Sequence, residues 1–147
     1  MSNNTVKWTA FEAAALISNA TATASAGFAT PATVYDNSLA TARHQFGFLQ
    51  LQLASLAVAN PGAVTFFATP SLDGTNYADS PSATNPAGQD IVAICSTNTT
   101  TAAHEINTPM FPLAPIKYKF AFQNQLGVAT SNSTNTFNFY VADHIVL

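Results

Sequence analysis

The sequence predicts an all-β protein, an antiparallel β-sandwich of jelly-roll or immunoglobulin-like type with an extended N-terminal arm. Three observations predict this fold. Short segments with apolar residues at every second position recur along the chain, turn residues separate these segments, and no long stretch has convincing helical periodicity. Since 147 residues fit one domain of common size, we expect an Ala/Thr/Ser-rich arm over residues 1–33 and the sandwich over residues 34–147.

The N-terminal arm differs in composition from the rest of the chain. The run from Asn19 to Thr33 is rich in Ala, Thr and Ser, which indicates an arm or an extended edge. The stretch from Trp8 to Ile17 fits either a helix or a strand, because Glu12 followed by three alanines favours a helix but the segment is short. Such an arm can cover its own core or dock on a neighbouring subunit. Its candidate interface residues are Val6, Trp8, Phe11 and Leu16.

The first strong strand pattern lies at residues 46–53. Leucines alternate with glutamines over residues 49–53, which places the leucines on one face of a sheet. Phe46 and Phe48 share the parity of the glutamines. The strand is therefore expected either to bury both faces at its start or to carry a bulge near Gly47.

Shorter patterns follow along the chain. Val64–Thr69 is predicted as a second strand that Pro70 ends. Asp73–Asn76 is predicted as a turn, since aspartate bonds its own downstream backbone and glycine accepts a positive φ. Asp90–Cys95 and His104–Asn107 are predicted as two further short strands.

The clearest strand covers residues 116–123. Aromatic and aliphatic residues occupy its even positions, while the odd positions from Lys117 to Gln123 are expected to face solvent. The segment Asn124–Gly127 then turns the chain. A final strand is predicted over Phe137–Ala142, where apolar residues again alternate with polar ones.

The low charge limits the possible functions. Only 7% of the residues are Asp, Glu, Lys or Arg, against about 25% in an ordinary soluble domain. Burying neutral polar groups costs less than burying unpaired charges, so this composition suits a subunit that packs against neighbours. Four basic residues and a net charge of -3 give no footprint for nucleic acid. No apolar stretch indicates a membrane or a secretory signal, so we expect folding in a reducing cytoplasm, with Cys95 as a buried inert thiol.

Residue types that could carry catalysis are widely dispersed. His44, His104 and His144 show none of the close spacings typical of a zinc site. Asp143 precedes His144, but adjacent strand residues point to opposite faces and no nucleophile-elbow sequence is present. A small hydrolase using His104 or Glu105 is the weakest hypothesis. We therefore expect a protein that is not an enzyme and has no cofactor.

Two binding hypotheses remain. Asp73, Asn76 and Asp79 offer three oxygen ligands within one loop, as a calcium site does, although a plain turn explains them better. Aromatic residues exposed on a sandwich can stack on sugars, which makes a carbohydrate-binding module the alternative function. Its candidate residues are Tyr35, Tyr77 and Tyr140.

Three stretches together resemble a family of small structural proteins of tailed bacteriophages that decorate or cement the capsid. These stretches are Val34–Ser38 ahead of the strand at 46–53, then Pro70–Asp79, and then Pro112–Phe120 followed by Gln123–Gly127 and Asn135–Phe137. The resemblance covers roughly residues 34 to 140. It implies a β-sandwich, often a homotrimer, that sits on the outer surface of the virion capsid and clamps adjacent major capsid proteins. A tail-associated receptor-binding module is the alternative location.

Overall fold

The computed structural model describes residues 6–9, 12–19, 26–29, 33–41, 43–54, 62–77, 90–98, 102–130 and 135–146. These residues form β-strands and contain no α-helix. The strands are β1 (Val6–Trp8), β2 (Glu12–Asn19), β3 (Phe28–Ala29), β4 (Val34–Asp36), β5 (Phe46–Leu53), β6 (Ala63–Ser71), β7 (Ile91–Ser96), β8 (His104–Asn107), β9 (Phe111–Pro112), β10 (Lys117–Gln125), β11 (Thr136–Ala142) and β12 (His144–Val146).

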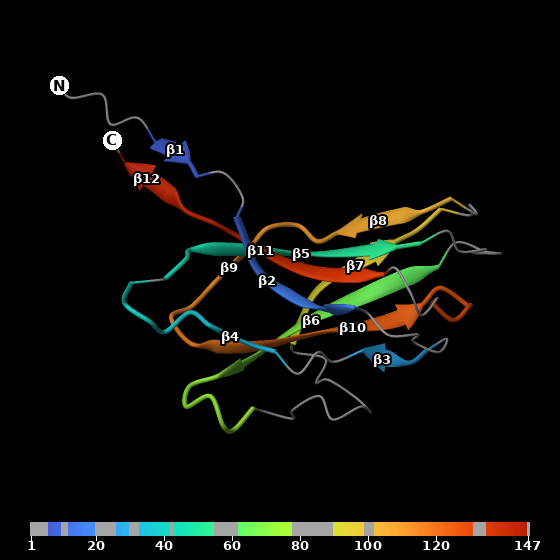
Figure 1. Cartoon of the computed structure of the whole chain (residues 1–147), viewed down its shortest axis with the longest axis horizontal. Helices are drawn as coiled ribbons and strands as arrows, with labels where there is room; N and C mark the ends of the chain where they lie inside the picture. The colour runs from blue at the N-terminus through green and yellow to red at the C-terminus, as the bar shows by residue number, and fades with distance from the viewer. Residues whose placement is uncertain are drawn as a thin grey trace.

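Two five-stranded antiparallel sheets pack against each other (Figure 1). One sheet has the order β3-β10-β6-β7, with β4 also paired to β10. The other has the order β2-β11-β5-β8, with β9 also paired to β5. The strands β1 and β12 form a separate two-stranded ribbon. The prediction of an all-β sandwich is therefore confirmed.

The core lies between the two large sheets and is rich in aromatic rings. The rings of Phe120 and Phe139, from opposite sheets, have centroids 4.3 Å apart, and those of Phe122 and Phe137 are 5.2 Å apart. All four side chains are almost fully buried. Each buried phenylalanine stabilises the fold by about 1.5–3 kcal/mol, so contacts between the sheets supply much of the stability.

Strand β5 confirms the prediction from its leucine pattern and shows how the strand begins around Gly47. Its three leucines are buried in the core. Pairing with β11 runs without a register shift through Gly47, so this strand has no bulge there. A Cβ at Gly47 would lie 2.5 Å from Cε2 of Phe139, which explains the glycine. Phe46 and Phe48 lie half-buried on the outer face, where they contact His144 and Tyr140.

Two sequence-based expectations for the other sheet are wrong in detail. Strand β6 continues through Pro70 to Ser71, because β10 pairs with it there while β7 pairs only as far as Phe67. Proline has no backbone N–H to donate to a neighbouring strand. Because β7 no longer pairs with β6 at Pro70, the missing donor interrupts no pairing on that side. The outer face of β10 is not uniformly exposed either. Ala121 is fully buried, and it lies opposite Phe67, whose ring contacts that of Phe28.

The predicted N-terminal arm contributes strands to every sheet. Glu12–Asn19 is a strand, which resolves the choice between helix and strand. It forms the edge beside β11, while Phe28–Ala29 pairs with β10. Backbone pairing with β11 thus prevails over the helical propensity of the three alanines, since intrinsic propensity is a weak signal beside tertiary context.

Candidate functional site

Three chain connections meet at one end of the sandwich, here called the loop end. Lys117, the first residue of β10, lies opposite both Ser71 of β6 and Asp36 of β4. The connections that follow β4 and β6 and the one that precedes β10 are therefore neighbours, on the left in Figure 1. This end contains the turn 72–76, the β4–β5 connection and residues 113–116.

The turn 72–76 is organised by the carboxylate of Asp73. Its Oδ1 accepts hydrogen bonds from the backbone N–H groups of Thr75 and Asn76, both at 2.8 Å. Its Oδ2 accepts one from Nδ2 of Asn76 at 2.7 Å, and Gly74 has a φ of 74°. These hydrogen bonds, led by those of Asn76 and Thr75, lower the pKa of the Asp73 carboxyl well below its usual value. The predicted turn is confirmed, and Asp79 of the calcium hypothesis lies outside the described residues.

Lys117 ties the turn to the neighbouring connection. A Cβ at Gly74 would lie 2.4 Å from Cδ of Lys117, so the lysine side chain passes directly against the turn. Its Nζ then pairs with Oδ2 of Asp36 at 3.2 Å. Hydrogen bonds from Ser38, together with this ion pair, hold the pKa of Asp36 below its ordinary value.

Asn37 fixes the base of the β4–β5 connection. Its side chain is only 1% exposed. Its Oδ1 accepts a hydrogen bond from the N–H of His44 at 2.8 Å, and its Nδ2 donates to the carbonyls of His44 and Ala114, both at 2.9 Å. One amide therefore joins two of the three connections at the loop end.

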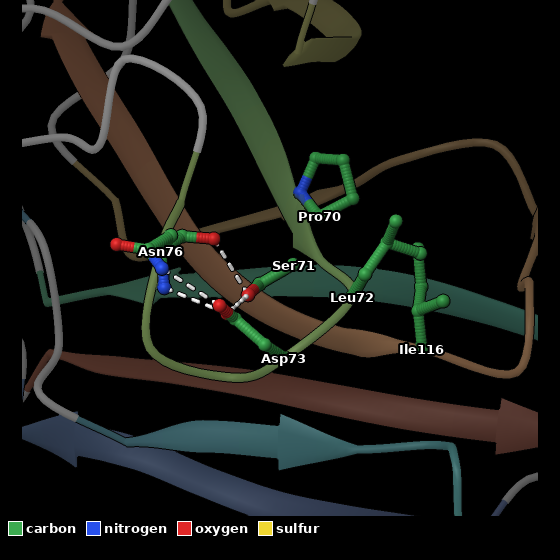
Figure 2. A pocket seen from close by; sticks show the side chains of 6 residues that line it. All are labelled: Pro70, Ser71, Leu72, Asp73, Asn76 and Ile116. Carbon is green, nitrogen blue, oxygen red and sulfur yellow. Dashed lines mark hydrogen bonds between the residues drawn. The ribbon is translucent and has the colours of Figure 1, made fainter.

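Large apolar side chains lie exposed beside this polar framework at the loop end. Leu72 is 88% exposed and Leu39 is 54% exposed. Leu72 also lines a hollow of about 490 Å³. In Figure 2, Pro70, Leu72 and Ile116 lie on one side and the hydrogen-bonded Ser71, Asp73 and Asn76 lie on the other. Asp73 is the only titratable group among the described residues of this lining, and its carboxylate is already bonded within the turn. The apolar side of the hollow fits the binding of an apolar group.

The predicted interface residues separate into two places. Val6 lies opposite Val146, and Trp8 lies opposite His144, in the ribbon of β1 and β12. This ribbon stands away from the sandwich, at the upper left of Figure 1 and towards the loop end. Leu16 instead lies in β2, opposite Asn138 of β11. Phe11 lies outside the described residues.

The junction between the ribbon and the sandwich contains a pair that sequence reasoning missed. Oδ2 of Asp143 lies 2.8 Å from Nδ1 of His44, and Oδ1 accepts the N–H of Gln45 at 2.7 Å. The backbone of Asp143 exchanges hydrogen bonds with Thr9 as well. Asp143 thus pairs with a histidine 99 positions away, and no local motif could have indicated it.

The remaining candidate residues, His104, Glu105 and Cys95, lie in or beside the strands β7 and β8. His104 and Glu105 are adjacent on β8 and so point to opposite faces of the sheet. Cys95 is half-buried against the core, and burial raises the pKa of its thiol. Among the described residues, no group of three His, Cys, Asp or Glu side chains is arranged to hold a metal ion.

Each of the three candidate tyrosines has a ring that is partly covered by another side chain. Tyr35 packs edge-on against Phe139 at 4.7 Å, and burial raises the pKa of its hydroxyl to about 12. Tyr77 is buried, with Nζ of Lys119 4.1 Å from its ring centroid. Tyr140 is half-buried and stacks on Phe48 at 4.8 Å.

Comparisons with protein-family models, with curated proteins and with solved structures each found no match for this chain. The described residues include no helix that is long and apolar enough to cross a membrane.

Proposed function

We propose that this protein is a structural component of a bacteriophage virion that binds the outer surface of the capsid and stabilises the shell. The observation that carries the proposal is the exposed apolar side chain of Leu72 at the loop end, which is 88% exposed beside the hollow that Pro70 and Ile116 line. A large apolar side chain in full contact with water favours burial against a partner. The partner in this proposal is the major capsid protein.

The proposed mechanism is thermodynamic linkage. A protein that binds only the assembled lattice stabilises that lattice in proportion to its occupancy. No catalytic group is needed, and a chain with 7% charged residues loses little free energy when its surface is buried. A homotrimer is the proposed oligomer, as the resemblance to capsid decoration proteins suggests.

Capsid binding can be tested by co-sedimentation with shells that lack the protein. The substitution Leu72→Asp places a charge in the proposed contact, and we expect it to weaken binding by about tenfold or more. Ala129→Asp is the matched control, because it adds the same charge at an exposed position after the other end of β10. Equal binding by both variants would contradict a contact at the loop end.

Location on the particle is a separate question that immunogold labelling answers. Gold distributed over the icosahedral head is the expected result. Gold confined to the tail would replace the capsid proposal with the receptor-binding alternative, and the absence of gold from all particles would refute both.

One observation favours the carbohydrate-binding alternative. Phe48 and Tyr140 stack on the outer face of β5 and β11, and Oε1 of Gln50 accepts hydrogen bonds from the hydroxyl of Tyr140 at 3.1 Å and from Nδ2 of Asn138 at 3.2 Å. Aromatic rings beside ordered amides are groups that bind sugars. A glycan array probed with the wild type and with Tyr140→Ala tests this alternative, which requires a signal that the substitution removes.

A further inference from the structure

Strand β7 forms one edge of its sheet and lacks the charges and prolines that usually protect an edge. Its sequence from Ile91 to Ser96 contains no charged residue and no proline. Within the part of the chain that the structure describes, β6 is the only strand paired with it. Ile94 is 64% exposed and Ile91 is 41% exposed. An uncharged edge with exposed isoleucines is a template for pairing with another strand.

The other edges of the two sheets carry protective features. β4 holds Asp36, which is paired with Lys117, and β9 ends at Pro112. β8 is four residues long and includes Glu105, β3 is two residues long, and β2 carries one charge, Glu12, at its first position. Charges, prolines and short length are the usual means by which edges avoid association. Among the edge strands that the structure describes, β7 is the one longer than three residues that has neither a charge nor a proline anywhere in its sequence.

The inner side of β7 is already occupied by the protein itself. Cys95 lies opposite the buried Val64, and its Sγ donates to the carbonyl of Asn107 in the facing sheet at 3.4 Å. A register shift between Phe66 and Phe67 disturbs the start of the strand. The segment from Ala93 to Ser96 remains regularly paired with β6. No described strand pairs with the other backbone edge of these four residues, which is the part that a partner strand would use.

We propose that β7 pairs in antiparallel fashion with β7 of a second copy of this chain, across a two-fold axis. A two-fold axis perpendicular to a sheet makes two identical edge strands antiparallel without further adjustment. Neither strand carries a charge, so the two edges do not repel each other. The second copy is the partner whether or not the protein decorates a capsid, and on a shell the contact would join neighbouring subunits.

The register of this pairing follows from the faces of the strand. Residues directly opposite each other in the pair lie on the same face of the sheet, so core-facing residues of one copy must lie opposite core-facing residues of the other. The two-fold axis between the strands is therefore level with one residue of each strand rather than with the gap between two. An axis at Ile94 sets the two Ile94 residues opposite each other on the outer face and sets Ala93 opposite Cys95. This register covers the most exposed apolar side chain of the strand.

Disulfide trapping tests the register directly. In a Cys95→Ser background, Ile94→Cys places two thiols at directly opposite positions, where Cβ atoms lie about 4.5–5.5 Å apart and a disulfide can form with small adjustments. We expect rapid formation of a covalent dimer on mild oxidation. Leu72→Cys in the same background is the control, because it is more exposed but lies at the loop end. Cross-linking of Ile94→Cys no faster than that of the control would overturn the proposal.

Sedimentation velocity tests the same contact without cysteine chemistry. The wild type is expected to show a concentration-dependent mass, and Ile94→Lys is expected to weaken self-association by about tenfold or more, since a charge on an edge opposes pairing. Leu72→Lys is expected to behave as the wild type does. A wild type that sediments as a monomer at every concentration, or two lysine variants that weaken association equally, would refute pairing through β7. Thermal unfolding confirms that each variant is folded.

Discussion

At the scale of single residues, a few polar side chains hold the loop end together. Asp73 closes the 72–76 turn, Asn37 joins two connections, and Lys117 passes across Gly74 to Asp36. The exposed Leu39 and Leu72 lie in the segments that these side chains hold together, and neither belongs to the buried core. Individual substitutions should therefore measure how much each of these interactions contributes to the free energy of unfolding.

Gly74 and Gly127 form a matched pair, because both have positive φ, at 74° and 76°. Gly127→Ala has open space around its new Cβ, so it should cost only about 1–2 kcal/mol of backbone strain. Gly74→Ala has the same strain and also displaces Lys117, so its loss in the free energy of unfolding should be larger. Urea unfolding measures both values. In a Lys117→Ala background the difference between the two alanine variants should disappear, and its persistence would contradict the steric explanation.

The acid side of the stability profile follows from Asp73 and Asp36, whose folded-state pKa values are lowered. A lowered pKa means that the carboxylate stabilises the folded state above the unfolded-state pKa of about 3.9 and that this stabilisation is lost as the pH falls through the folded-state pKa. The wild type should therefore lose stability below roughly pH 4. Asp73→Asn should show a shallower loss, measured as the urea midpoint at a series of pH values. An identical slope in the variant would count against the role of Asp73.

At the scale of elements, the sequence predicts strand positions better than strand partners. The final strand matches β11 almost residue for residue, and His104–Asn107 matches β8, because alternation is a local signal. The β2 strand was ambiguous, because its alanines favour a helix and only pairing with β11 decides otherwise. Local sequence predicts that Pro70 ends its strand, because proline disrupts most strands. The strand in fact continues, since β10 pairs with it at Pro70 while β7 does not, and the sequence alone does not reveal this order of strands.

The candidate site was predictable only in part. The Asp73 turn has a local sequence signature, so it was found. The exposure of Leu72 depends on which loops surround it, and the pair of Asp143 with His44 joins residues that only the fold brings together. Alternation cannot reveal either feature.

Gly47 gives a prediction about the pairing of β5 with β11. A Cβ at this position would lie 2.5 Å from the ring of Phe139, which is fully buried. Gly47→Ala should therefore destabilise the protein by about 1–3 kcal/mol through overpacking. Thermal unfolding measures the loss. Combining it with Phe139→Leu should cost less than the two single losses together, and simple additivity would argue against the contact.

At the scale of the whole molecule, the ribbon and the sandwich should contribute differently to thermal stability and to capsid binding. An isolated two-stranded ribbon is marginally stable in water, so removal of residues 1–8 should leave the thermal midpoint of the sandwich nearly unchanged. Under the proposed function, the same deletion should weaken binding to the capsid, because it removes the candidate interface residues Val6 and Trp8. Removal of residues 1–18 also strips β2 from β11 and should lower the midpoint clearly. Unchanged capsid binding after the shorter deletion would show that the ribbon is not an anchor.

The pairing of β1 with β12 brings the first and last described strands side by side, beyond the sandwich and towards the loop end (Figure 1). A fusion partner added to either terminus would therefore crowd the surface proposed to meet the capsid. A displayed peptide or reporter belongs instead in the turn after β10, around Gly127, where an added Cβ meets no atom within 4 Å. The closeness of the two strands also makes the chain suited to circular permutation, with new ends opened at that turn.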